Sequence, residues 1–129
     1  MQTITVGDAF GQYGERLDLT LEAGEAGLKN ELVSSDVHRP GLALAGFVGM
    51  FTFDRVQVLG NTEMLYIASL DPARVEQVVA TIFQFDIPAL VITDDNDVLP
   101  VLKELADRHE VPLLRTPSST TKFAHLFSL

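Results

Sequence analysis

Hydrophobic positions follow a regular pattern in the second half of the chain, where short apolar runs alternate with amphipathic stretches. We predict strands at residues 55–59, 89–92 and 112–115. The run Ala89–Ile92 is unbroken and apolar, which is typical of a strand buried on both faces of a sheet. The stretches between these strands are long enough to form the helical crossovers that connect parallel strands.

Start signals and apolar spacing predict the helices of this half. Asn61 is the expected N-cap of a helix that runs to about Leu70, and Asp71 followed by Pro72 starts the next helix. A further helix is expected to end near His109, and another to start at Ser119. The helix after Pro72 carries one continuous apolar stripe: Val75, Val78, Val79, Ile82 and Phe83.

The first half of the chain is less regular. Leu17, Leu19 and Leu21 alternate with polar residues, as in a half-buried strand. Other elements expected here are strands at 3–6 and 31–34, a helix at 8–13 that Gly14 ends, and a short helix at 42–46. We therefore predict an α/β fold of three layers, α/β/α, with a mixed, mostly parallel sheet whose antiparallel edges come from the first half.

Composition is consistent with one compact domain over residues 1–129. The chain has 129 residues, of which 47% are hydrophobic, and no Cys, so neither disulfides nor thiolate metal sites can support the fold. The segment Met1–Val6 lacks the basic and apolar regions of a secretory signal. No apolar stretch approaches the roughly 20 residues that span a bilayer, so we expect a cytoplasmic protein with no membrane contact.

The chain is acidic, with a formal net charge of −9. Such a surface disfavours binding to nucleic acid, which depends on neutralising phosphates. The excess is densest in the first 36 residues, where two cations, Arg16 and Lys29, face seven acids: Asp8, Glu15, Asp18, Glu22, Glu25, Glu31 and Asp36. An ordinary solvated surface is the favoured interpretation. A basic partner is the alternative.

Phosphoryl-transfer chemistry has no recognisable motif in this sequence. The P-loop pattern G-x-x-x-x-G-K-[ST] does not occur, and the nearest fragment, Gly24–Lys29, has the wrong spacing. The three histidines, His38, His109 and His125, share no metal-ligand spacing. The chain alone is therefore not expected to be an enzyme, and we assign no catalytic, cofactor-binding or metal-binding residue.

Three polar or aromatic clusters have structural interpretations. Asp94–Asp97 lacks the glycine and terminal glutamate of an EF-hand loop and is interpreted as a cap of the following helix. Ser118–Thr121 is interpreted as an N-cap and turn, and not as a source of nucleophiles. Phe47, Phe51 and Phe53 are interpreted as core or interdomain packing, with an exposed interaction patch as the alternative.

One edge of the predicted sheet is a candidate anion site. If the three strands are parallel, the turns that follow them meet at their carboxyl ends, where ligands bind in such sheets. Free amides of helix N-termini attract anions there. The candidate residues are Gly60, Asn61, Thr62, Thr93, Arg115 and Thr116. The alternative is that these residues only cap helices.

Several segments have a characteristic order and spacing: Thr3–Tyr13, Arg39–Gly46 with Ser35 and Asp36 before it, Asp54–Glu63, Pro88–Thr93, Val111–Thr116 and Ser119–Phe123. In this order and spacing they resemble the N-terminal domain of bacterial HPr kinase/phosphorylase. The resemblance covers nearly the whole chain, except that Val48–Met50 differs from the aromatic-rich segment usual in that family.

This resemblance implies a non-catalytic regulatory or oligomer-assembly domain. The family's complete protein looks like a hexameric enzyme of carbon catabolite regulation, which uses ATP and Mg²⁺ to phosphorylate a serine of HPr and reverses the reaction by phosphorolysis. Its catalysis is expected in a C-terminal P-loop kinase domain absent from this chain, which would then be its partner in the same protein. The domain is also similar in fold to the uridine-nucleotide-binding domain of Mur ligases. The alternative function is therefore a sensor module for a small anion or nucleotide.

The last helix is expected to be amphipathic. Phe123, Leu126 and Phe127 share one face, which should pack on this domain or on a neighbouring chain. Because this segment reaches Leu129 without a helix cap or a polar tail, we expect the natural chain to continue further.

Overall fold

A five-stranded mixed sheet forms the centre of the molecule. The computed structural model describes residues 4–34, 36–49 and 51–128; Thr3, Ser35, Met50 and Leu129, which belong to segments discussed above, lie outside them. The strand order is β2-β7-β6-β5-β4, and β2 is antiparallel to β7 while the other neighbours are parallel. The strands are β2 (Thr20–Ala23), β4 (Val37–His38), β5 (Val56–Leu59), β6 (Leu90–Ile92) and β7 (Leu113–Arg115).

This arrangement confirms the predicted mixed, mostly parallel sheet. The three strands of the second half pair in parallel through Val58 with Val91 and Val91 with Leu114. The predicted strand at 17–22 starts later, because Leu17 lies fully buried in the turn before β2. Strand β4 was not predicted.

A second, two-stranded ribbon lies at the border of the sheet. It pairs β1 (Ile4–Thr5) with β3 (Glu31–Leu32) in antiparallel register, and the 3-10 helix η1 (Glu25–Lys29) precedes β3. Asn30 joins the ribbon to the main sheet, because its side-chain amide donates hydrogen bonds to the carbonyls of Pro88 and Glu110 at 3.2 and 3.1 Å.

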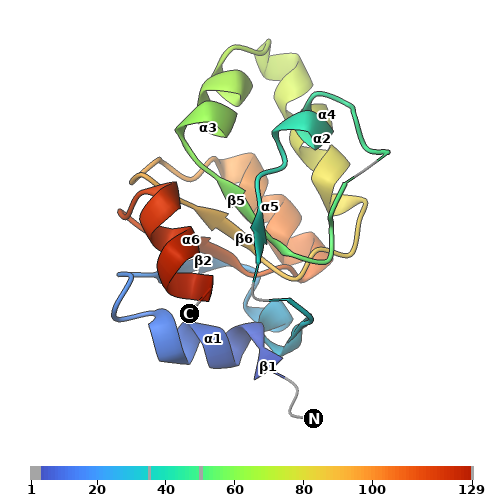
Figure 1. Ribbon diagram of the computed structural model, residues 1–129. Helices are drawn as coiled ribbons and strands as arrows, with labels where there is room; N and C mark the ends of the chain where they lie inside the picture. Colours follow the sequence, from blue (N-terminus) through green and yellow to red (C-terminus); the bar gives the residue numbers. More distant parts are fainter. Residues whose placement is uncertain (1–3, 35, 50, 129) are drawn as a thin grey trace.

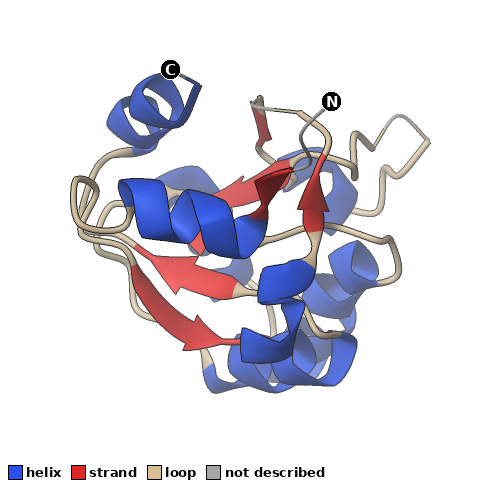
Figure 2. Ribbon diagram, turned by 90° about the horizontal axis from the view of Figure 1, so that it is seen from below, coloured by secondary structure: helices blue, strands red, loops and turns tan. Residues whose placement is uncertain are grey.

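Helices cover both faces of the sheet, as Figures 1 and 2 show. One face is covered by α1 (Val6–Tyr13) and α6 (Thr120–Ser128), which lie next to each other. The other is covered by α2 (Gly41–Leu44), α3 (Asn61–Ala68), α4 (Pro72–Phe83) and α5 (Pro100–His109). The layers are therefore α/β/α, as predicted. No helix within the described ranges is long and apolar enough to cross a membrane.

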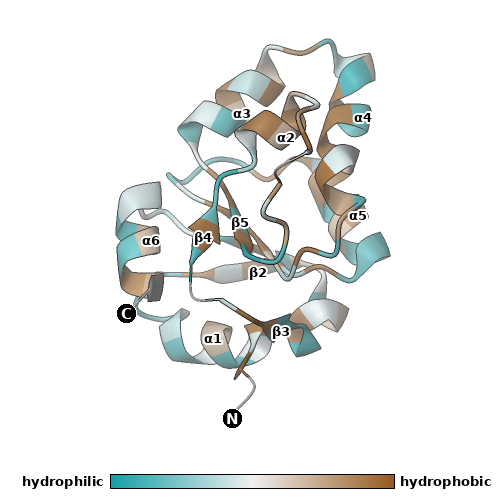
Figure 3. Ribbon diagram, turned by 45° about the vertical axis from the view of Figure 1, so that its right-hand side comes forward, coloured by the Kyte–Doolittle hydropathy of each residue, from teal (hydrophilic) through white to brown (hydrophobic). Residues whose placement is uncertain are grey.

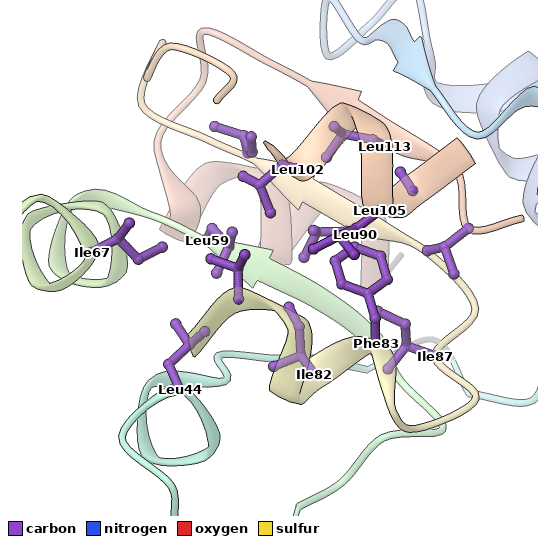
Figure 4. Close-up of a cluster of buried hydrophobic side chains, with 14 of the residues drawn as sticks. Leu44, Leu59, Ile67, Ile82, Phe83, Ile87, Leu90, Leu102, Leu105 and Leu113 are labelled. Carbon is purple, nitrogen blue, oxygen red and sulfur yellow. The ribbon is translucent and has the colours of Figure 1, made fainter. Parts of the chain in front are cut away.

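Alternation along the strands divides the core into two clusters. In β5, Val58 points to the side of α1 and α6, while Leu59 points to the side of α4 and α5. Figure 4 shows the larger cluster, in which Ile82 and Phe83 of α4 meet Leu90 of β6. Four of the five residues of the predicted α4 stripe are buried, and Val75 is half-buried at its end.

The last helix packs on this domain. Phe123 is 1% exposed and Phe127 is 9% exposed, and their rings stack with centroids 5.4 Å apart. The ring of Tyr13 on α1 lies 5.8 Å from that of Phe127, and Leu126 is partly buried beside them. The predicted contact face is confirmed.

The predictions for two helix starts and for three aromatic residues have different outcomes. Asn61 is the first residue of α3 and Gly60 is its N-cap, whereas Asp71 and Pro72 start α4 as expected. Phe51 packs against Phe85 and the larger core cluster, so core packing is confirmed for it. Phe53 is 41% exposed, and its ring stacks on Phe85 with centroids 5.7 Å apart. Core packing is wrong for Phe47, which lies in the loop after α2, is 72% exposed and reaches neither core cluster; interdomain packing of its ring stays a prediction.

Replacing Phe123 tests the contribution of α6. Phe123→Ala should lower the free energy of unfolding by about 3–5 kcal/mol, because it leaves a cavity between α6 and the sheet. Lys122→Ala, a change on the exposed face of the same helix, should shift it by less than about 0.5 kcal/mol. Urea denaturation followed by circular dichroism measures both. Equal effects would contradict the packing described here.

His38 should make stability depend on pH. Burial and, secondarily, the charge of Arg55 lower the pKa of His38 in the folded protein below its ordinary value of 6.5. The unfolded chain therefore takes up the proton first, so the stabilisation is complete above the unfolded pKa and is lost as pH falls from there through the lower folded pKa. Denaturation at about pH 7.5 and 5.5 should show a smaller loss of stability for His38→Asn than for the wild type.

Candidate functional site at the carboxyl edge of the parallel strands

The turns that follow four parallel strands meet at one edge of the sheet. Arg39 follows β4, Gly60 follows β5, Thr93 follows β6 and Thr116 follows β7. The register places them side by side, because Leu59 pairs with Ile92 and Ile92 with Arg115. Helices α3 and α6 both start at this edge. Ligands bind at such edges in open α/β sheets.

An ion pair between a buried carboxylate and a partly exposed guanidinium occupies the part of the edge nearest β4. Glu63, at the third position of α3, is 4% exposed, and its Oε1 accepts hydrogen bonds from Arg39 Nη2 at 3.0 Å and Nε at 3.3 Å. The same oxygen accepts the Gly60 N–H at 2.8 Å. The carboxylate thereby caps the first turn of α3 and neutralises the guanidinium of Arg39, whose side chain is 46% exposed.

A second polar group joins β6 to α6. The hydroxyls of Thr93 and Thr120 are hydrogen-bonded at 2.6 Å, and Thr120 donates to the Asp94 carboxylate at 3.3 Å. Asp94 has a positive φ of 59°, and its N–H donates to the carbonyl of Ser118 at 2.8 Å. This contact between two turns places the start of α6 against the end of β6. Ser119 caps α6 by accepting the Lys122 N–H at 3.1 Å, as predicted for the Ser118–Thr121 segment.

Gly60 lies where these two groups meet. Its backbone is extended, with φ −101° and ψ −163°, so a conformational need for glycine is absent. The need is for space: a Cβ here would overlap Thr120 Oγ1 and would lie 3.2 Å from Arg39 Nη2 and 3.3 Å from Asp94 Oδ2. The two polar groups therefore pack across the backbone of one residue.

Arg115 is engaged by the loop after β6. Its Nε and Nη2 donate to the carbonyls of Asn96 and Asp95 at 2.8 and 2.9 Å, and Nη2 lies 3.1 Å from Asp95 Oδ1 and 3.9 Å from Asp97 Oδ1. The Asp94–Asp97 segment therefore wraps Arg115 and does not cap the following helix. That prediction is wrong because α5 starts only at Pro100, with Leu99 as its N-cap.

The structure brings the six predicted site residues to one edge. Asn61 Oδ1 accepts from Asn96 Nδ2 at 3.1 Å, and Thr62 is exposed on the first turn of α3. Thr93 and Thr116 are fully buried, and the Thr116 hydroxyl donates to the carbonyl of Leu17. The Gly60 amide, the Arg115 guanidinium and both threonine hydroxyls thus already have protein partners. An anion at this edge remains a prediction, and binding would have to compete with these contacts.

Sequence reasoning missed four members of this site: Arg39, Glu63, Asp94 and Thr120. Glu63 had a readable signal, since a glutamate three residues after a helix N-cap is the acidic half of a capping box. Arg39 had none, because it follows a strand of only two residues. Chemically, the arrangement balances two guanidinium groups with carboxylates and joins three strands to two helices. Among the described residues, no three His, Asp or Glu side chains gather as metal ligands.

Introducing a methyl group at Gly60 tests this arrangement. Gly60→Ala should destabilise the fold by about 1–3 kcal/mol through overpacking. Combining it with Thr120→Ala, which removes the overlapping hydroxyl, should restore part of that loss in a double-mutant cycle. Gly11→Ala is the control: nothing lies near a Cβ on that exposed helical residue, and the change should stabilise by about 0.5–1 kcal/mol. Chemical denaturation compares the wild type with the two single variants, the double variant and the control; additive losses at Gly60 and Thr120 would contradict the steric account.

Comparison with solved structures identifies a related architecture. The regulatory region of Clostridium perfringens pyrophosphatase, which comprises CBS and DRTGG domains and was crystallised with the activator diadenosine tetraphosphate, superposes with a TM-score of 0.64. The match covers 95% of this chain and 47% of that chain, at 12% sequence identity. At this identity the likeness establishes the fold alone.

Comparison of sequences identifies the family. The family model described as HPr Serine kinase N terminus matches residues 4–128. The HPr kinase/phosphorylases of Chloroherpeton thalassium and of Chlorobium phaeobacteroides strain BS1 are 37% and 36% identical to this chain over 98% of its length. The chain spans 38% of the length of each of these relatives. It therefore belongs to the family of HPr serine kinase N-terminal domains.

Proposed function

We propose that this chain is the non-catalytic N-terminal domain of a bifunctional HPr serine kinase/phosphorylase that acts in carbon catabolite regulation. The observation that carries the proposal is the family match over residues 4–128, together with relatives that are more than twice as long. The kinase chemistry, with ATP and Mg²⁺, then belongs to a C-terminal P-loop domain. HPr is the substrate of that domain, and the whole protein is a cytoplasmic homo-oligomer, a hexamer by the family resemblance.

A regulatory or assembly role is supported by the polar groups of the candidate site. Phosphoryl transfer needs a phosphate cradle, a metal ligand and a base that face a substrate. At the carboxyl edge, the cations Arg39 and Arg115 are paired with Glu63 and Asp95, and the hydroxyls of Thr93 and Thr120 bond to each other. These contacts stabilise a scaffold. The printed sequence also lacks the P-loop pattern, which supports placing catalysis elsewhere in the protein.

Two experiments test this function. The purified chain, incubated with ATP, Mg²⁺ and HPr, should form no phosphorylated HPr above the no-protein control.

Removing the equivalent segment from the Chloroherpeton thalassium relative should leave phosphoryl transfer intact per folded molecule, while changing its oligomeric state or its response to metabolites. If phosphoryl transfer is lost while the remaining part stays folded, the domain carries catalytic groups and the proposal fails.

A second candidate function, binding of a small anion or nucleotide, is favoured by the register that gathers Gly60, Thr93 and Arg115 at one edge. Titration with phosphate, fructose bisphosphate and uridine nucleotides, followed by amide NMR shifts, tests it. Saturable shifts at these turns that disappear in Arg115→Ala would support the site. Absent or uniform shifts would mean that Gly60, Thr93 and Arg115 keep their contacts within the protein and bind no anion.

A further inference from the structure

A hollow lies at the opposite, amino edge of the sheet. It has a volume of about 380 Å³ and is bordered by the residues before β5, those before β6 and those around β3. Its lining includes Glu31, Val33, Phe53, Asp54, Asp86 and Ile87. Figure 3 shows β3 below the sheet, next to α1. The hollow and the candidate site therefore lie at opposite ends of the strands.

Three carboxylates from three separate segments border this hollow. Glu31, Asp54 and Asp86 are exposed, and none of them makes an ion pair within the described part of the chain. The cations adjacent in sequence have other partners: Arg55 lies 3.7 Å from Asp36, and Lys29 lies 3.7 Å from Glu110. The three negative charges therefore face the hollow without compensation from the fold.

Apolar surface lies directly beside these charges. Val33 is 70% exposed, and Phe53 is 41% exposed with its ring held against Phe85 at 5.7 Å. Ile87 and Pro88 are buried and form the floor. Val33 also borders a neighbouring hollow lined by Ile4, Tyr13 and Phe127, so the apolar surface continues past it. The combination of uncompensated acids with an apolar strip favours a ligand that is both cationic and apolar.

We propose that this hollow docks an extended basic segment of another protein, in which Lys or Arg alternates with apolar residues. A cationic side chain would lie among Glu31, Asp54 and Asp86 and next to the face of Phe53. Its apolar neighbours would cover Val33. A second copy of this chain is disfavoured as occupant, because both copies carry a net charge of −9. The acidic composition suggested a basic partner without indicating where it binds, and the hollow is such a place. This inference does not depend on the proposed function.

An NMR and anisotropy titration tests this proposal. The probe is a short amidated peptide that alternates leucine with lysine, and the control peptide has glutamate in place of lysine. The lysine peptide should cause saturable amide shifts centred on Val33, Phe53 and Asp86. The triple variant Glu31→Gln, Asp54→Asn, Asp86→Asn should weaken its binding about fivefold or more. Val33→Ser should also weaken it.

A matched variant separates this site from general charge attraction. Glu15→Gln, Asp71→Asn and Glu76→Gln change the net charge by the same amount, at exposed acids that have no ion-pair partner within the described ranges. This variant should bind the lysine peptide within about twofold of wild type. Equal weakening in both triple variants, or equal binding of the glutamate peptide, would overturn the proposal. All substitutions are at exposed side chains, and circular dichroism verifies that the variants remain folded.

Discussion

The buried carboxylate of Glu63 is the constraint on which the carboxyl edge depends. A carboxylate that is 4% exposed must find compensation within the protein, because an unpaired buried charge costs several kcal/mol. Arg39 provides the opposite charge and the Gly60 amide provides a further donor, both at the same oxygen. The pair also crosses from the end of β4 to α3, so it helps to hold a strand that pairs with β5 through only two residues. Gly60 must stay small for this geometry to exist.

Regular elements were readable from the sequence because their patterns are long enough to be specific. The stripe from Val75 to Phe83 continues for more than two helical turns, and the run Ala89–Ile92 has no polar interruption. The start of α4 and both ends of β6 were therefore placed within a residue. Strand β4 contains only Val37 and His38, too few to establish a period. Its position comes from pairing with β5, which is tertiary information that no local window contains.

In the candidate site, too, one part could be predicted from the sequence and another could not. Parallel register alone brings Gly60, Thr93 and Thr116 to one edge, and this was predictable from the order of strands and helices. The partner of each polar group was not. Arg115 was expected to face a ligand, yet Asp95 and Asn96 take its donors because positive φ angles at Asp94 and Asp95 turn their loop back toward it. Such backbone conformations are uncommon for residues other than glycine and leave no periodic signal.

The pairing of β2 with β7 has a consequence for how the chain folds. Thr20 pairs with Arg115, and Tyr13 packs on Phe127, so the layer of α1 and α6 joins segments about a hundred residues apart. The parallel pairs from β5 to β7, by contrast, close over shorter segments, residues 60–89 and 93–112, and therefore have a lower contact order than the pairing of β2 with β7. Closing the long loop between β2 and β7 carries an entropic cost, which is offset only when these distant segments make contact late in folding. During synthesis, the central sheet with α3, α4 and α5 can therefore fold first. The apolar faces of β2 and α1 stay exposed until β7 and α6 have left the ribosome and can cover them.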